Sequence, residues 1–73
     1  MEAEDWNRLA CNLLKSELAK AGIGYDGLIK RLAEIGVTES YKGIANKINR
    51  GAYSFAFFMQ CMKALGIQTI RLD

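Results

Sequence analysis

The residues best suited to binding chemistry lie together in the third quarter of the 73-residue chain. Lys42, Lys47 and Arg50 are cations that can meet phosphate groups. Asn46 and Asn49 carry side-chain amides, which suit the hydrogen-bonding edge of an adenine. Residues 39–54 contain three basic residues and one acidic residue, so this stretch carries a net charge of +2, equal to that of the whole chain. The composition favours a surface that reads a nucleic-acid groove, although a plain solvated helix face has a similar composition.

Four helices are expected to position these residues, because apolar side chains recur at helical spacing between glycine stops. The expected fold is all-α, and its helices cover about residues 5–21, 25–35, 39–50 and 54–65. Thr38 or Ser40 can cap the third helix, Ser54 can cap the fourth, and Gly51 ends the third. At this length, we expect a single domain with a small core.

The helical spacing also predicts which side chains point inward. In the first helix, the inner stripe contains Trp6, Leu9, Ala10, Leu13, Leu14, Leu18 and Ala21. In the third helix, the spacing favours Tyr41 as a core residue beside Ile44 and Ile48. In the fourth helix, the inner stripe contains Phe55, Phe58, Cys61, Met62 and Leu65. Phe57 and Met59 fall outside that stripe, which predicts that they are available for self-association.

The tail is rich in β-branched residues, and its alternation predicts a short strand over about residues 67–72. Two such strands pairing across a two-fold axis would satisfy their backbone groups and make a homodimer. The tail folding back on the first helix of its own chain is the alternative. The expected dimer interface consists of Phe57, Met59, Ile67, Thr69, Ile70 and Leu72.

Enzymatic and metal chemistry have little support in the residue types. The chain has no histidine, and Cys11 and Cys61 lack the spacing of a zinc site. The expected state of the two cysteines is a pair of small buried thiols, with a disulfide or redox switch as the alternative. No carboxylate pair or phosphate-cradling glycine loop stands out, so we expect no catalysis, no cofactor and no metal. No apolar run could span a membrane and no signal peptide is evident, which favours a cytoplasmic protein.

Three short motifs between residues 13 and 67 resemble those of Cro and lambda-repressor helix-turn-helix domains. They are Lys20-Ala21-Gly22-Ile23, Ile48-Asn49-Arg50-Gly51 and Lys63-Ala64-Leu65-Gly66-Ile67. The chain departs from the repressor pattern at residues 34–43, where the connection before the third helix is longer, and at Gly24-Tyr25, which replace the usual Ser-Gln. The whole chain is also similar to an uncharacterised bacterial domain family of unknown function, through Trp6, Asn12-Leu13-Leu14-Lys15, Asn46-Lys47-Ile48 and Phe57-Phe58-Met59-Gln60-Cys61.

The resemblance implies a repressor-like fold that reads double-stranded DNA with its third helix. It implies that the residues approaching bases are Ser40, Tyr41, Lys42, Gly43 and Asn46. It also implies phosphate contacts from Lys47, Arg50, Tyr53 and Ser54, and we group Asn49 with them. The expected function is therefore sequence-specific DNA binding by a small homodimeric transcriptional regulator. The alternative is a protein-binding module, of the kind found in phage or plasmid inhibitors and antitoxins, that uses the last helix and the tail.

Overall fold

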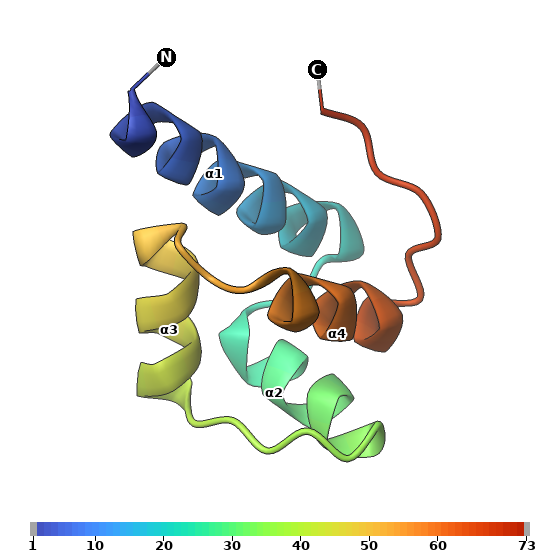
Figure 1. Ribbon diagram of the computed structural model, residues 1–73. Coiled ribbons are helices and arrows are strands. Elements are labelled where there is room, and N and C mark those ends of the chain that lie inside the picture. Colours follow the sequence, from blue (N-terminus) through green and yellow to red (C-terminus); the bar gives the residue numbers. More distant parts are fainter. Residues whose placement is uncertain (1, 73) are drawn as a thin grey trace.

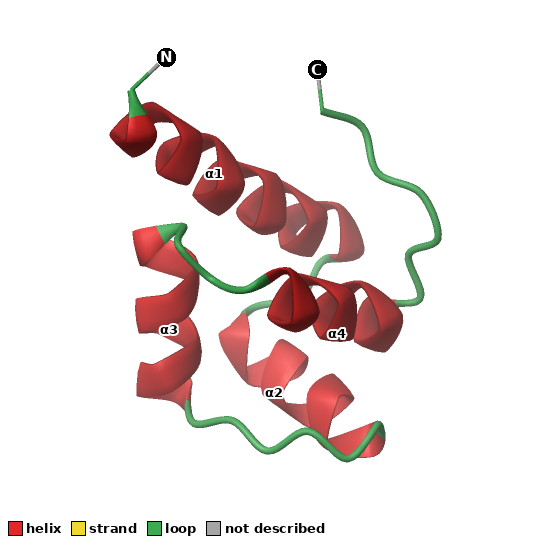
Figure 2. Cartoon of the chain, in the orientation of Figure 1, coloured by secondary structure: helices red, strands yellow, loops and turns green. Residues whose placement is uncertain are grey.

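The computed structural model describes residues 2–72, which form four α-helices joined by short connections (Figures 1 and 2). The helices are α1 (Ala3–Ala21), α2 (Tyr25–Glu34), α3 (Tyr41–Arg50) and α4 (Phe55–Leu65). Helix α1 packs on α3, and α2 packs on both α3 and α4. The predicted all-α, four-helix architecture is confirmed. No helix within residues 2–72 is long and apolar enough to cross a lipid bilayer.

Local hydrogen bonds set the ends of the helices that matter most for the site. The Ser40 hydroxyl accepts a hydrogen bond from the Gly43 N–H at 3.0 Å, and the Ser54 hydroxyl accepts one from the Phe57 N–H at 3.0 Å. Each serine thereby satisfies an N–H that the first turn of its helix leaves unpaired. Helix α3 starts at Tyr41, two residues later than expected, because Ser40 provides the cap.

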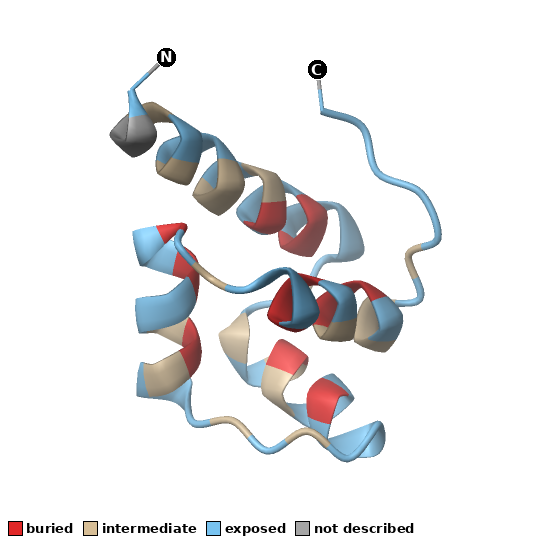
Figure 3. Cartoon of the chain, in the orientation of Figure 1, coloured by how far each residue is buried: buried red, intermediate tan, exposed pale blue. Residues whose placement is uncertain are grey.

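One buried cluster draws on all four helices (Figure 3). Its members are Leu14, Leu18, Leu28, Leu32, Ile44, Ile48, Phe57, Phe58, Cys61 and Met62. Burying a side chain the size of leucine or isoleucine contributes about 1.5–3 kcal/mol. Ile44 and Ile48, both fully buried, therefore hold the inner side of α3 against the rest of the domain and turn its opposite side outward.

Several burial predictions are wrong, and they share a cause. Trp6 and Leu9 are 60% and 46% exposed, because α1 is rotated so that the side carrying the buried residues Leu14 and Leu18 faces the domain, and the Trp6 and Leu9 side does not. Phe55, expected inside, is 75% exposed, whereas Phe57, expected outside, is only 4% exposed. The inner side of α4 is thus rotated toward Phe57, which packs under a side chain of α3.

The predicted C-terminal strand is also wrong, since residues 2–72 contain no strand. A strand needs another extended segment for its backbone hydrogen bonds, and the helical domain offers none. After α4 ends, the Ile67 N–H donates to the Met62 carbonyl at 2.9 Å, and the tail then turns back toward α1 (Figure 1). Leu72 lines a hollow together with Leu9 and Leu13 of α1. This position agrees with the alternative prediction, in which the tail folds back on the first helix of its own chain.

Candidate nucleic-acid interface

The outward side of α3 carries four exposed polar side chains, Lys42, Asn46, Asn49 and Arg50. We call this set the outer side of α3. None of the four forms a side-chain hydrogen bond or ion pair with another residue of the described segment 2–72. Two cations and two amides are therefore free to bind a ligand. The amides can donate and accept hydrogen bonds, and the cations can meet anionic groups.

The start of α3 is built around its cap. A Cβ atom added at Gly43 would lie 2.9 Å from the Ser40 hydroxyl oxygen and 3.5 Å from Glu39 Oε1. Glycine at this position therefore leaves room for the Ser40 cap, which is a structural reason for its presence, whereas 3.5 Å from Glu39 is an ordinary contact. Tyr41 is 55% exposed, so the prediction that it is a core residue is wrong. Its ring packs edge-on against Tyr25, with centroids 5.6 Å apart.

Lys47 lies on a different flank of α3, the one that faces α4. Its ammonium group donates to the Glu39 carboxylate at 2.6 Å and lies 5.0 Å from the centre of the Phe57 ring. The Glu39 side chain is only 12% exposed, and Lys47 provides its ion pair. Of the predicted phosphate-binding cations, Lys47 is therefore the one already engaged within the protein.

Beneath this ion pair lies Cys61, whose side chain is fully buried. Burial raises the pKa of its thiol to about 12, the negative charge of Glu39 also raises it, and Lys47 opposes the effect. Both Cys61 and Cys11 are free, and Cys11 is only partly buried. The structure thus contains two free thiols, although the prediction that both are buried holds only for Cys61.

The loop between α3 and α4 uses its predicted phosphate-binding groups internally. The Tyr53 hydroxyl donates to the Ala10 carbonyl of α1 at 2.6 Å, and the Ser54 hydroxyl caps α4. Burial raises the pKa of the Tyr53 hydroxyl to about 12, with smaller effects from Cys61 and Cys11. Tyr53 is half-buried, and its ring stacks on Phe58.

The far end of α3 sits directly on α1. A Cβ atom at Gly51 would overlap the backbone carbonyl of Asn7, and the backbone of Gly51 is left-handed, with φ of 67°. This close approach brings Asn49 and Arg50 of α3 beside Asn7 and Arg8 of α1.

A groove of about 310 Å³ lies between the two helices, lined by Asn7, Arg8 and Cys11 of α1 and by Asn49 and Arg50 of α3. Arg8 is only loosely paired, with its guanidinium 3.8 Å from the Asp5 carboxylate. Arg8 and Asn7 were absent from the predicted site. Their positions on α1 signal exposure, but nothing in the sequence alone places them beside α3.

The residues predicted for a dimer interface differ in their exposure. Phe57 is buried within the chain and leaves almost no area for a partner, whereas Met59 is 57% exposed on α4. In the tail, Ile67 packs partly on the core, whereas Thr69 and Ile70 are exposed. Leu72 is 84% exposed, although it lies beside α1.

The chain was compared with known protein families, with curated proteins and with solved structures. Residues 6–70 match a family described as a domain of unknown function, DUF6471. No curated protein and no solved structure matches the chain. The match spans most of the chain, from the start of the α1 stripe to the tail. The protein therefore belongs to the DUF6471 family.

Proposed function

We propose that this protein binds double-stranded DNA by placing the outer side of α3 in a major groove. The observation that carries the proposal is the set of two cations and two amides that lie exposed and unpaired on one side of a ten-residue helix. An α-helix fits the width of the major groove, where base edges present distinct hydrogen-bonding patterns. Sequence-specific binding of this kind would make the protein a small transcriptional regulator.

The arrangement of the helices supports the proposal. Helix α3 packs on α2 and is joined to it by residues 35–40, in the order expected from the repressor-like resemblance. The inner side of α3 is fixed by the buried residues Ile44 and Ile48, so the outer side is presented rigidly. A reading helix held on a folded scaffold loses little freedom on binding, which favours affinity.

The side chains divide into two roles. Asn46, near the middle of the outer side, and Asn49 have amides that suit an adenine edge. Lys42 and Arg50 extend from either end of the helix and suit the phosphates that flank the groove, and Arg8 of α1 adds a third cation beside Arg50. Lys47 contributes less to the proposed surface, because its ammonium group already pairs with Glu39.

A sequence-selection experiment tests the proposal. The 73-residue protein is incubated with a random pool of duplex DNA, and bound duplexes are amplified and sequenced over several rounds. We expect one enriched motif. We also expect Asn46→Ala to show a weaker base preference at particular positions of the motif. Each lost base contact should reduce the free energy that discriminates between bases by about 1–3 kcal/mol. Absence of enrichment, together with equal DNA affinity for wild type and a Lys42→Ala/Arg50→Ala variant, would refute DNA reading by α3.

A further inference from the structure

A second surface of the molecule is apolar and uncovered. We propose that it binds a second copy of this chain, so that the protein is a homodimer joined through α1, the start of α4 and the tail. We call this surface the apolar face and define it by Trp6, Leu9, Leu13, Phe55 and Leu72. It shares no residue with the outer side of α3, and the inference stands independently of DNA binding.

The apolar face is continuous across three segments. A hollow of about 310 Å³ is lined by Trp6, Leu9, Ala10, Leu13 and Leu72. A neighbouring hollow of about 300 Å³ shares Ala10 and Leu13 and is completed by the loop before α4 and by Phe55 and Phe58. Exposed fractions of 60% for Trp6, 75% for Phe55 and 84% for Leu72 are large for apolar side chains. Single exposed apolar residues are common, whereas a contiguous apolar patch of several hundred Å² is often a functional surface.

The size of the apolar face suits a dimer. If about 200 Å² is taken for each of these side chains, the exposed parts of Trp6, Leu9, Phe55 and Leu72 amount to roughly 500 Å². A standard interface buries about 800 Å² on each partner, and a little more than half of that area is apolar. The apolar face therefore supplies about the apolar area that one side of a stable interface needs. Burial by a partner would also add to the small core of a 73-residue chain.

The face can also be complementary to itself. An interface with two-fold symmetry must offer both a projecting and a receiving part on the same surface. Phe55 projects at the start of α4, and the hollow between Trp6, Leu9 and Leu13 lies across Ala10 from it.

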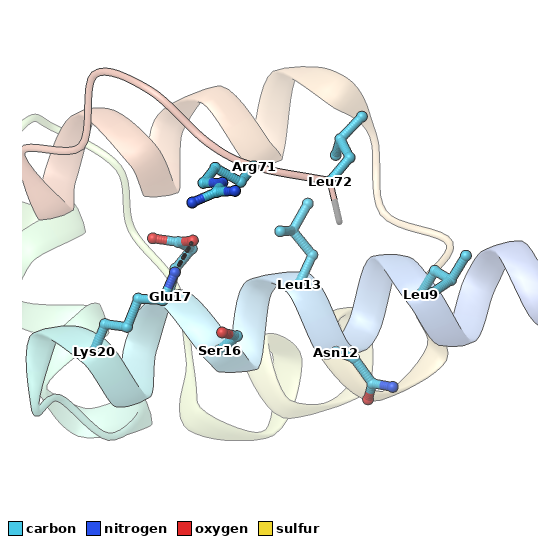
Figure 4. A pocket seen from close by; sticks show the side chains of 8 residues that line it. All are labelled: Leu9, Asn12, Leu13, Ser16, Glu17, Lys20, Arg71 and Leu72. Atoms are coloured by element: carbon cyan, nitrogen blue, oxygen red, sulfur yellow. Dashed lines mark hydrogen bonds and ion pairs between the residues drawn. The ribbon is translucent and has the colours of Figure 1, made fainter.

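Next to this hollow, both signs of charge are present. Glu17 pairs with Lys20 at 3.5 Å, and Arg71 of the tail lies over Glu17 (Figure 4). The same view shows Leu72 opposite Leu13 (Figure 4). Two copies would therefore not meet with like charges alone.

The dimer is tested first by mass. Sedimentation equilibrium over micromolar to millimolar protein should give a mass rising to twice the 8.1 kDa of the chain. Trp6 is the single tryptophan and lies on the apolar face, so its emission should shift to shorter wavelength as the dimer forms. A chain that remains monomeric throughout this range would overturn the proposal, whatever the result of DNA-binding experiments.

Charge substitutions then locate the interface. Phe55→Glu and Leu9→Glu should each raise the dimer dissociation constant at least about tenfold, because a carboxylate would be buried against apolar groups. Ile35→Glu is the matched control, since Ile35 is 40% exposed and lies at the end of α2, outside the apolar face. Circular dichroism checks that each variant keeps its helices. A dimer that survives both face substitutions, or one that Ile35→Glu disrupts equally, would contradict the proposal.

Discussion

Two flanks of α3 carry cations of similar chemistry in different situations. On the outer side, Lys42 and Arg50 project into solvent without a protein partner. On the flank facing α4, Lys47 is held by Glu39 and lies against the Phe57 ring, above a buried thiol. The three residues belong to one helix and all three carry a positive charge, yet we expect Lys47 to act in stability and the other two in binding. Availability, as well as charge, decides which cation can serve a ligand.

The largest expected effect comes from breaking the contact that positions both flanks. Gly51→Ala would force a Cβ atom into the Asn7 carbonyl and would also strain a left-handed backbone. We expect a loss of about 3 kcal/mol or more in the free energy of unfolding, measured by urea denaturation. Gly22→Ala is the control, because Gly22 has a φ of 68° with open space around it and should cost about 1 kcal/mol. Equal losses in the two variants would mean that α1 and α3 do not meet at Gly51.

The buried thiol beneath Lys47 gives the next effect. Cys61 should react with a thiol reagent at least about a hundredfold more slowly than Cys11, because it is exposed only when the protein opens. Mass spectrometry of the labelled protein separates the two sites. Similar labelling rates in the native protein would show that the flank is not packed as described.

The same thiol predicts a dependence of stability on pH. The pKa of Cys61 is about 12 in the folded protein, against an ordinary value of 9. Between these values, the unfolded chain has lost the proton that the folded chain keeps, so stability should fall as pH rises from about 9 toward 12. Tyr53, with its pKa raised from 10 to about 12, acts in the same direction. Thermal unfolding of wild type and Cys61→Ala should show a shallower alkaline decline for the variant.

Alanine substitutions of Lys47 and Arg50 compare what the two flanks contribute to stability. Lys47→Ala should lower the free energy of unfolding by about 1–2 kcal/mol, because it leaves the poorly exposed Glu39 carboxylate without its partner. Arg50→Ala should change it by no more than about 0.5 kcal/mol, as is usual for exposed surface residues. Equal stability of the two variants by urea denaturation would remove the distinction between the flanks.

A smaller effect is expected from releasing Lys47. Glu39→Gln removes one negative charge beside α3 and frees the ammonium group, so DNA affinity should rise by a few-fold at low salt. Fluorescence anisotropy with a labelled duplex measures the change. When Glu39→Gln is introduced into the Lys47→Ala variant, the gain in DNA affinity should shrink. An undiminished gain would mean that the released lysine plays no part.

The local features of the fold were predictable from the sequence. Ser54 and Gly51 mark helix boundaries because capping and left-handed turns depend on neighbouring residues. The inner residues Ile44 and Ile48 follow from helical spacing alone. The outer side of α3 was predictable for the same reason, since it lies opposite these residues.

The failures concern contacts between elements. Phe55 and Phe57 differ by two positions, and which of them is buried depends on how α4 is rotated against α2 and α3. The pairing of Lys47 with Glu39 spans eight residues and depends on how the connection before α3 is folded. Arg8 joins the site only because Gly51 lets α3 approach α1. The period-two alternation of the tail predicts a strand, but residues 2–72 offer the tail no extended partner.

The salt dependence of DNA binding tests the central claim most directly. Affinity for the selected duplex is measured at several salt concentrations for wild type, for Lys42→Ala/Arg50→Ala, and for Lys15→Ala/Lys63→Ala. The last variant removes the same charge from exposed positions on α1 and α4. If the outer side of α3 meets phosphates, the slope of log affinity against log salt should fall by about two for the α3 variant and stay unchanged for the control. Equal slopes for all three proteins would contradict the account.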